Sequence, residues 1–272
     1  MKKFVSALVA FAATTSAAFA SDLAAKAPAF KAPVATAYNW TGWYVGVNGG
    51  GDWANSNITE TDIAPLVVNI PAAQRQFSMR HSGVLGGLQG GYNWQFAPNW
   101  VAGLEADIAF SNDRGSTTSG FLFGGAFPGN FMADTRTDWL ATTRARIGFL
   151  PAERVLVYAT GGAAFGHVKT NGSVNNNFGA PLVLGAVPVC QNNSVCYQGS
   201  ESKTAAGWTL GGGLEYAVWN NVTAKLEYLY VDLGARTLTL SPSPTTTGGG
   251  AATFAFGDSV YNIVRAGVNL KF

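Results

Sequence analysis

The side chains of this sequence that could do chemistry are charged residues placed two positions apart. Glu105 and Asp107 form an acidic pair, and Arg144 and Arg146 form a basic pair. Side chains two positions apart project from the same face of a β-strand, and enclosed charges persist only when paired and hydrogen-bonded. We therefore predict one enclosed network of four acids and five bases. Its members are Glu105, Asp107, Arg144, Arg146, Glu215, Lys225, Glu227, Arg265 and Lys271.

A second set of residues faintly resembles the nucleophile block of a serine hydrolase, at Gly257-Asp258-Ser259. Nucleophile activation needs a base and a group that orients the base. His81 and His167 are the only histidines, and neither can be placed beside Ser259 from the sequence. We expect both near the outer rim of their strands. Because no Cys/His spacing matches a zinc pattern either, we predict no catalytic, cofactor-binding or metal site and no enzyme activity.

Eight segments of the chain alternate apolar and polar side chains with a period of two, and the nine charged residues lie within them. The segments are 43–48, 82–96, 100–110, 136–149, 155–168, 202–217, 222–233 and 259–272. The short connections lie near 97–99, 150–154 and 218–221, and connections longer than twenty residues lie near 54–81, 111–135, 169–201 and 234–258. Short turns at one end and long loops at the other are typical of outer-membrane β-barrels.

The apolar faces of the segments favour a closed barrel over a secreted β-sandwich, which also alternates. Aromatic residues gather where the segments meet the short turns, as in the aromatic girdle of a membrane barrel. These are Trp43, Trp94, Phe96, Trp100, Phe149, Tyr216, Trp219 and Phe272. In lipid every backbone polar group needs a partner within the protein, and a sheet provides this only by closing. We predict an all-β fold, one eight-stranded antiparallel up-and-down transmembrane barrel over residues 40–272.

The last segment must pair with the first to close this barrel. Its outward side is the apolar row Val264, Ala266, Val268, Leu270 and Phe272, and its inward side is Arg265, Gly267, Asn269 and Lys271. An arginine at position 268 would enter the lipid and cost about 2–4 kcal/mol. An arginine at position 269 would point into a polar lumen, so we expect a much milder effect there.

The N-terminus carries the features of a secretory signal peptide over residues 1–20. Lys2 and Lys3 precede an apolar stretch that ends at the A-x-A site formed by residues 18–20. The stretch is shorter than the ~20 residues of a spanning helix, which disfavours an uncleaved anchor. Residues 21–39 form an Ala/Pro-rich periplasmic linker. Cleavage removes two of the 17 basic residues and no acid, leaving 15 basic against 15 acidic, so we expect no nucleic-acid partner.

Cys190 and Cys196 are the only cysteines and fall in the third long loop. An even number of cysteines in an exported chain favours a disulfide, with two free thiols in a loop as the alternative. A disulfide that closes a loop this small stabilises the folded state by on the order of 2–3 kcal/mol at most. We therefore expect the bridge to shape the loop tip without deciding whether the barrel folds.

Five blocks of the sequence resemble those of small outer-membrane proteins of the opacity and OmpA-like barrel type. They are YNWTGWYVG at 38–46, GGYNWQ at 90–95, YATGGAA at 158–164, KLEYLYVDLG at 225–234 and VRAGVNLKF at 264–272. The chain is most similar to the "outer membrane immunogenic protein" branch, often labelled porin family. The resemblance covers 38–272 and implies an outer-membrane location and a structural or surface-antigen role. It implies no catalytic residues.

Three functions remain open at this point. An eight-stranded barrel is just wide enough for side chains to fill, so a lumen plugged by charges and a structural, surface-exposed role are favoured. The alternative is a narrow porin-like diffusion channel for small solutes, and a barrel-type lipid-modifying enzyme is the least favoured.

Location and partners follow from the barrel and from the resemblance. Three short turns and four long loops place both termini in the periplasm of a Gram-negative bacterium and the long loops outside. We expect contact with outer-membrane lipids and lipopolysaccharide, and a monomer without cofactors. The resemblance further implies that the barrel insertion machinery reads the terminal Phe272.

Overall fold

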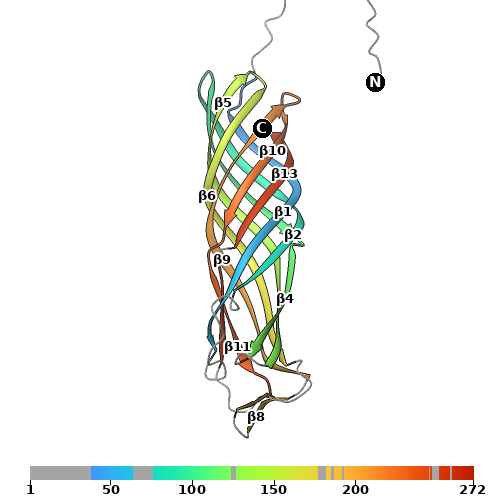
Figure 1. Cartoon of the computed structure of the whole chain (residues 1–272). Coiled ribbons are helices and arrows are strands. Elements are labelled where there is room, and N and C mark those ends of the chain that lie inside the picture. Colours follow the sequence, from blue (N-terminus) through green and yellow to red (C-terminus); the bar gives the residue numbers. More distant parts are fainter. Residues whose placement is uncertain are drawn as a thin grey trace, which may run out of the picture. The chain divides into compact units, whose positions relative to one another are not determined.

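The computed structural model describes residues 38–63, 76–123, 127–176, 182–184, 187–191, 193–244, 246, 251–257 and 259–272. The predicted signal peptide and all of the predicted linker before Tyr38 lie outside these residues. Among the described residues there is no helix long and apolar enough to cross a bilayer. The described chain is a sheet closed on itself (Figure 1).

Eight antiparallel strands close the barrel, which confirms the predicted fold. They are β1 (Gly42–Ile63), β2 (Gln76–Ala97), β3 (Trp100–Ser111), β5 (Phe127–Ala152), β6 (Val155–Asn176), β9 (Ser194–Ala217), β10 (Val222–Asp232) and β13 (Val260–Lys271). Each pairs with the next in this order, and β13 returns to pair with β1, where Val45 lies opposite Leu270 and Asn48 opposite Gly267. This pairing closes the ring of eight strands, so no open sheet edge exposes unpaired backbone groups to the membrane.

A second ring of strands extends the barrel beyond the predicted segments. β4 (Arg114–Phe123), β11 (Arg236–Pro242) and β12 (Ala252–Phe256) continue β3, β10 and β13 past short interruptions. They pair with the extended halves of β2, β5, β9 and β1. A separate hairpin joins β7 (Leu182–Leu184) to β8 (Val187–Cys190). Much of the predicted long loops is therefore strand, and that prediction was wrong.

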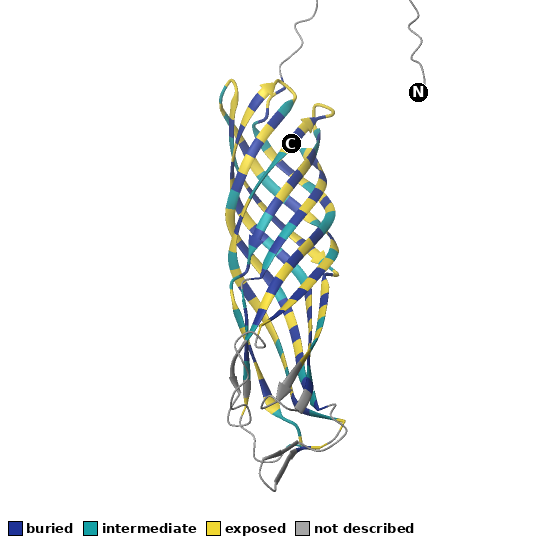
Figure 2. Cartoon of the chain, viewed as in Figure 1, coloured by how far each residue is buried: buried dark blue, intermediate teal, exposed yellow. Residues whose placement is uncertain are grey.

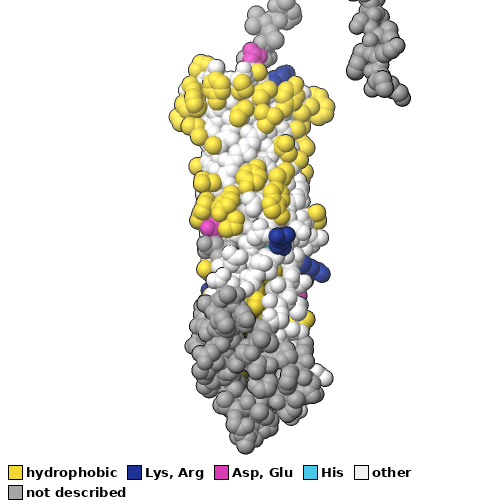
Figure 3. Space-filling view, viewed as in Figure 1, with side chains coloured by type: hydrophobic (Ala, Val, Ile, Leu, Met, Phe, Trp, Pro, Cys, Tyr) yellow, Lys and Arg dark blue, Asp and Glu magenta, His cyan; other side chains and the backbone are white. Residues whose placement is uncertain are grey.

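We call the end of the barrel with the short connections and Phe272 the turn end, and the opposite end the loop end. Between them the outer wall carries a band of exposed apolar side chains with aromatic residues at both margins. On β3 the margins are Trp100 and Phe110, and on β1 they are Trp43 and Trp53. Ten residues at a rise of ~3.3 Å and a tilt of ~40° span roughly 25 Å, the height of a membrane-facing band. Figure 3 shows these hydrophobic side chains on one face.

The alternation of side chains inverts where the strands leave this band. Within the band apolar groups point outward, whereas beyond it Ile58, Phe77 and Met79 point inward and Asn57 and Ser78 point outward. Figure 2 shows the resulting stripes of buried and exposed residues along the strands. The extended part of the barrel therefore has the pattern of a water-soluble barrel with an apolar core.

Two inward-facing glycines let neighbouring strands approach in the narrow part of the barrel. A Cβ on Gly50 would lie 2.1 Å from the Val264 carbonyl oxygen, and one on Gly211 would lie 2.2 Å from that of Tyr228. Both lie in runs of three glycines, at 49–51 and 211–213, and the close packing explains why a residue without a side chain is needed at these positions.

Candidate functional site in the barrel lumen

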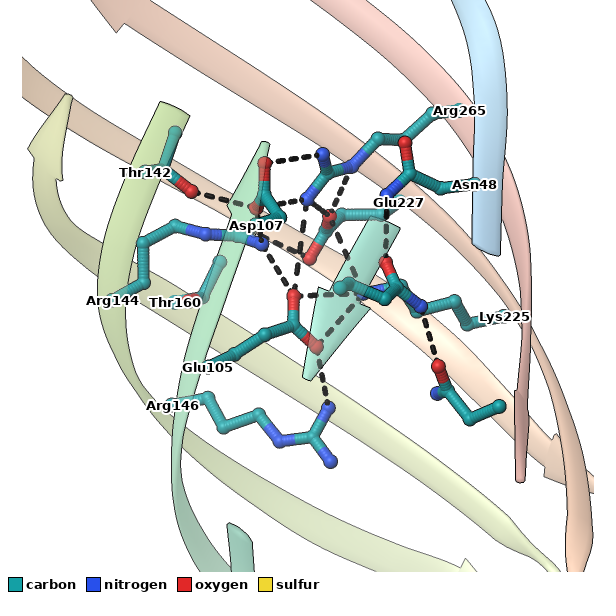
Figure 4. A network of polar contacts seen from close by, with 12 residues as sticks. Asn48, Glu105, Asp107, Thr142, Arg144, Arg146, Thr160, Lys225, Glu227 and Arg265 are labelled. Atoms are coloured by element: carbon teal, nitrogen blue, oxygen red, sulfur yellow. Dashed lines mark hydrogen bonds and ion pairs between the residues drawn. The ribbon is translucent and has the colours of Figure 1, made fainter. Parts of the chain in front are cut away.

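The structure brings eight of the nine predicted charged residues together in the lumen, and Figure 4 labels all of these except Glu215. Neighbouring strands supply pairs in direct register, with Glu105 opposite Arg144 and Glu227 opposite Arg265. The network contains the acids Glu105, Asp107, Glu215 and Glu227 and the bases Arg144, Arg146, Lys225 and Arg265. Four acids against four bases make its formal charge zero.

The pairs that matter most cross the lumen between strands that are not neighbours. Lys225 Nζ on β10 lies 2.8 Å from Glu105 Oε1 on β3, and Arg265 Nη2 on β13 lies 2.8 Å from Asp107 Oδ1 on β3. Arg144 also reaches from β5 to β10, where its Nη1 lies 2.9 Å from Glu227 Oε1. These contacts tie opposite walls of the barrel to each other through the space that a channel would need.

Neutral polar side chains add hydrogen bonds to the network. The Tyr44 hydroxyl donates to Glu105 at 2.7 Å, and the Thr142 hydroxyl donates to Asp107 at 2.7 Å. Asn269 donates to Glu215 at 2.9 Å and also accepts from Gln89. Buried ions cost free energy unless such contacts satisfy them, so this shell allows the charges to persist in the interior.

Lys271 lies at the turn end, where we had expected it to join the charge network. Its ammonium group donates to the main-chain oxygen of Asn39 and lies 5.0 Å from the ring centroid of Tyr38. The prediction failed because Lys271 is the last residue of β13, beyond the level of the acids, although the alternation gave its face correctly.

A cluster that we call the turn-end cap closes the lumen on one side of the charge network. Trp40 is only 1% exposed, and its indole nitrogen donates to the Glu153 carbonyl oxygen at 3.1 Å. Burial raises the pKa of Tyr38 to about 12. The remaining members of the cap are Val101, Leu150, Leu156, Tyr158 and Ala217. Tyr38, which we had placed within the linker 21–39, therefore packs as part of the barrel.

Two apolar clusters fill the lumen on the other side of the charge network. The middle layer comprises Ala54, Leu85, Ala109, Leu140, Ala164, Val168, Ala205, Leu229, Val231, Leu233, Tyr261 and Ile263. The loop-end core comprises Ile58, Phe77, Met79, Phe131, Ala133, Val174, Cys190, Cys196, Tyr197, Leu238, Leu240, Phe254 and Phe256. The middle layer was not predicted because, apart from Ala54, it lies on strand faces that we had expected to be polar, and the loop-end core was not predicted because it lies in segments that we had interpreted as loops. The signal that could have found them is the inverted alternation at positions such as 56–58 and 77–79.

The predicted disulfide between Cys190 and Cys196 is present, with Cα atoms 5.4 Å apart. Both cysteines are about 1% exposed and belong to the loop-end core. The bridge therefore lies inside the barrel wall and fixes the entry into β9, whereas the sequence had suggested that it shapes an exposed loop tip.

The two histidines lie just beyond the apolar band towards the loop end, near the rim where we expected them, but on opposite faces of the wall. His81 is buried in the lumen, where its Nδ1 lies 3.0 Å from Asp113 Oδ2 and its Nε2 lies 3.3 Å from Ser56 Oγ. His167 lies on the outer wall, stacked on Trp139 with ring centroids 6.1 Å apart. Ser259 is buried and its hydroxyl accepts a hydrogen bond from Arg236 at 2.6 Å.

The series Ser56, His81 and Asp113 has the connectivity of a hydrolase triad but lacks access. All three side chains are at most 4% exposed, and they lie between the middle layer and the loop-end core. A nucleophile must reach a substrate carbonyl, and this geometry leaves no room for one. Within the described residues, no group of three or more His, Cys, Asp or Glu side chains is arranged to hold a metal ion.

The sequence matches the family described as "Outer membrane protein beta-barrel domain" over residues 6–272. The chain belongs to this family. It is 34% identical to the 31 kDa outer-membrane immunogenic protein of Brucella melitensis over 274 residues, covering all of both chains. It is 28% identical to the 22 kDa outer membrane protein of Rhizobium leguminosarum, covering 89% of this chain and 82% of that protein.

The fold is also similar to that of a solved member of the outer-membrane barrels. The crystal structure of OprG from Pseudomonas aeruginosa aligns with a TM-score of 0.50 at 13% identity, covering 85% of this chain and 97% of that one. Together with the apolar band, these matches establish that the chain is an outer-membrane β-barrel protein of Gram-negative bacteria, with a lumen occupied by paired charges.

Proposed function

We propose that this barrel is a structural, surface-exposed component of the outer membrane that does not conduct solutes. The observation that carries the proposal is the charge network, whose cross-lumen ion pairs join opposite walls. The turn-end cap on one side and the middle layer and loop-end core on the other add three further levels of buried side chains. A hydrated path would have to open all four.

A diffusion assay with liposomes tests the closed lumen. Vesicles that contain the refolded barrel should swell no faster in an isosmotic solution of arabinose than empty vesicles do. Vesicles that contain a known porin serve as the positive control. Swelling above the empty vesicles would contradict the proposal and favour the narrow diffusion channel.

We propose that the barrel lies with its turn end in the periplasm and its loop end outside. Support comes from the three short connections at one end and the long strand extensions with polar outer faces at the other, which is the usual asymmetry of such barrels. The curated relatives named immunogenic fit a loop end that the host can reach. We propose a monomer that contacts outer-membrane lipids and is inserted through its C-terminal strand, which is followed by the exposed Phe272.

Labelling of intact cells tests this orientation. The two native cysteines are bonded to each other, so a single introduced thiol reports its own position. Thr118→Cys is an exposed loop-end site and Asn221→Cys an exposed turn-end site. A membrane-impermeant maleimide should label the first in intact cells and the second only after lysis. The reverse pattern would contradict the orientation.

We further propose that the barrel is not an enzyme, because the Ser56, His81 and Asp113 series is sealed between apolar layers. The refolded protein should hydrolyse neither short-chain nitrophenyl esters nor phospholipid vesicles above the rate of a Ser56→Ala variant. A loss of hydrolysis on that substitution would identify the buried series as a catalytic site.

A further inference from the structure

One side of the outer wall carries a row of cations just beyond the apolar band, towards the loop end. The basic row comprises Arg80 on β2, Arg114 on β4, Arg136 on β5 and Lys169 on β6, all exposed. Arg114 lies directly opposite Arg136, and Arg136 directly opposite Lys169. On β1, β11, β12 and β13, the described exposed side chains beyond the band include Asn55, Asn57 and Thr237 but no Lys or Arg.

The height of the basic row places it at the lipid headgroups. Arg114 follows the marginal Phe110 by four residues, and Lys169 follows Phe165 by four. Four residues at a rise of ~3.3 Å and a tilt of ~40° lie roughly 10 Å beyond the aromatic margin. Long basic side chains can bend back along the wall towards the membrane, so their charged ends reach the headgroup layer. Figure 3 shows basic side chains just beyond the hydrophobic band on the face that it displays.

Three cations of the row line a hollow in this wall. Its volume is about 400 Å³, and its lining includes Arg114, Arg136 and Lys169 together with the acid Asp134. Asp138 contacts two of the cations, lying 2.7 Å from Arg136 Nε and 2.9 Å from Lys169 Nζ. Three cations against two acids leave the hollow with one net positive charge, and the flanking Arg80 adds one more.

A second hollow lies on the same side of the barrel, within the apolar band. Its volume is about 430 Å³, and it exists because small residues, Ala106, Ala141 and Thr143, face outward between the larger Leu88 and Ile108. An acyl chain from a headgroup in the basic row would run along this stretch of wall. The two hollows thus offer an anionic headgroup and its hydrocarbon complementary surfaces on adjacent strands.

We propose that this wall is a binding site for a lipid A headgroup, with its phosphates in the basic row and an acyl chain in the apolar hollow. Adjacent strands are ~4.8 Å apart, so the row from Arg80 to Lys169 spans roughly 14 Å. That length suits a disaccharide with a phosphate at each end better than the single phosphate of a glycerophospholipid. The assignment rests on the proposed orientation, which puts this row in the leaflet that holds lipopolysaccharide.

The proposal is tested by using native mass spectrometry to measure how purified lipid A binds to the refolded barrel in detergent. Each Lys or Arg near an anionic surface contributes roughly fivefold to binding. The double variant Arg114→Gln/Lys169→Gln should therefore bind bisphosphorylated lipid A roughly 25-fold more weakly. It should bind dephosphorylated lipid A like the parent, because the apolar hollow is unchanged.

Two further variants separate a specific site from a general effect of charge or misfolding. Asp134→Asn removes an acid from the same hollow and should strengthen binding of bisphosphorylated lipid A. Arg154→Gln removes an exposed cation at the turn end and should leave binding unchanged. All variants must retain the heat-dependent gel shift of a folded barrel, which makes a loss of binding interpretable.

Three outcomes would overturn the proposal. They are equal binding of lipid A by the double variant and the parent, equal loss with Arg154→Gln, and equally effective competition by phosphatidylglycerol. None of these outcomes bears on the proposal that the lumen is closed. Conversely, labelling of Thr118→Cys from the periplasmic side would refute the orientation while leaving the binding measured in detergent intact.

Discussion

At the scale of single residues, the charge network depends on mutual satisfaction. Glu105 illustrates this, because its carboxylate contacts Arg144, Arg146 and Lys225 and accepts the Tyr44 hydroxyl. It is about 3% exposed, so water cannot replace a lost partner. The free-energy cost of the network thus appears when one member is removed and the others stay charged.

Glu105→Ala should therefore lower the free energy of unfolding by about 3–5 kcal/mol. Urea titration of the refolded barrel in detergent measures the change, and Glu153→Ala, which removes an exposed acid in a turn, is the matched control. The double variant Glu105→Ala/Lys225→Met should recover part of the loss, because it removes an acid and a base together. Equal midpoints for Glu105→Ala and Glu153→Ala would mean that the network is solvated.

At the scale of the strands, the side chain that a position tolerates depends on its height along the barrel as well as on the face of the strand that it occupies. Val268 on β13 faces lipid within the apolar band, whereas Asn57 on β1 faces outward beyond it. Val268→Arg should cost about 2–4 kcal/mol and Asn57→Arg close to zero, because the penalty for a charge on the lipid face falls towards the interface. The yield of heat-modifiable barrel in cells measures both. Equal yields would place the band at the wrong height.

Asn269, on the opposite face of β13, corrects an expectation drawn from the sequence. We had expected arginine there to be mild, because the residue points into a polar lumen. The structure shows Asn269 1% exposed and bonded to Gln89 and Glu215, so a larger, charged side chain has no space. Asn269→Arg should lower the yield about as much as Val268→Arg, through overpacking rather than through lipid exposure.

The disulfide belongs to the extended ring of strands and should stabilise that part alone. Replacing both cysteines by alanine removes a closed loop worth on the order of 2–3 kcal/mol from the loop-end core. The variant should keep its heat-dependent gel shift but lose resistance to trypsin at the loop end. Thiol labelling of the parent purified without reductant must remain negative, and labelling at both cysteines would refute the bridge.

The sequence predicted the strands of the band, their faces and most of the charge network. The prediction failed beyond the band, where the apolar side chains point inward instead of outward. Alternation with apolar groups outward identified Glu105, Arg144 and Arg265 as inward residues. It could not show that Arg144 reaches Glu227 across the lumen, because such contacts depend on the diameter and shear of the closed ring. The extended parts of the strands were not predicted, because their apolar side chains, such as that of Phe77, face inward.

At the scale of the whole molecule, the barrel combines a membrane-facing part with a lumen filled at four levels. β5 passes all of them, from Leu150 in the cap through Arg144 to Leu140 and then Phe131 in the loop-end core. Such a closed sheet should stay compact in detergent and migrate faster before boiling than after. Identical mobility in both conditions would contradict a closed barrel.

Single-channel recording in a planar bilayer tests the central claim, the closed lumen, most directly. Because ion pairs and three apolar clusters fill the lumen, the purified barrel should give no stable conductance at moderate voltage. A porin inserted under the same conditions must give its usual steps, and insertion of the barrel is verified by protease protection. Reproducible, long-lived current steps from the parent protein would contradict the account and establish the barrel as a channel.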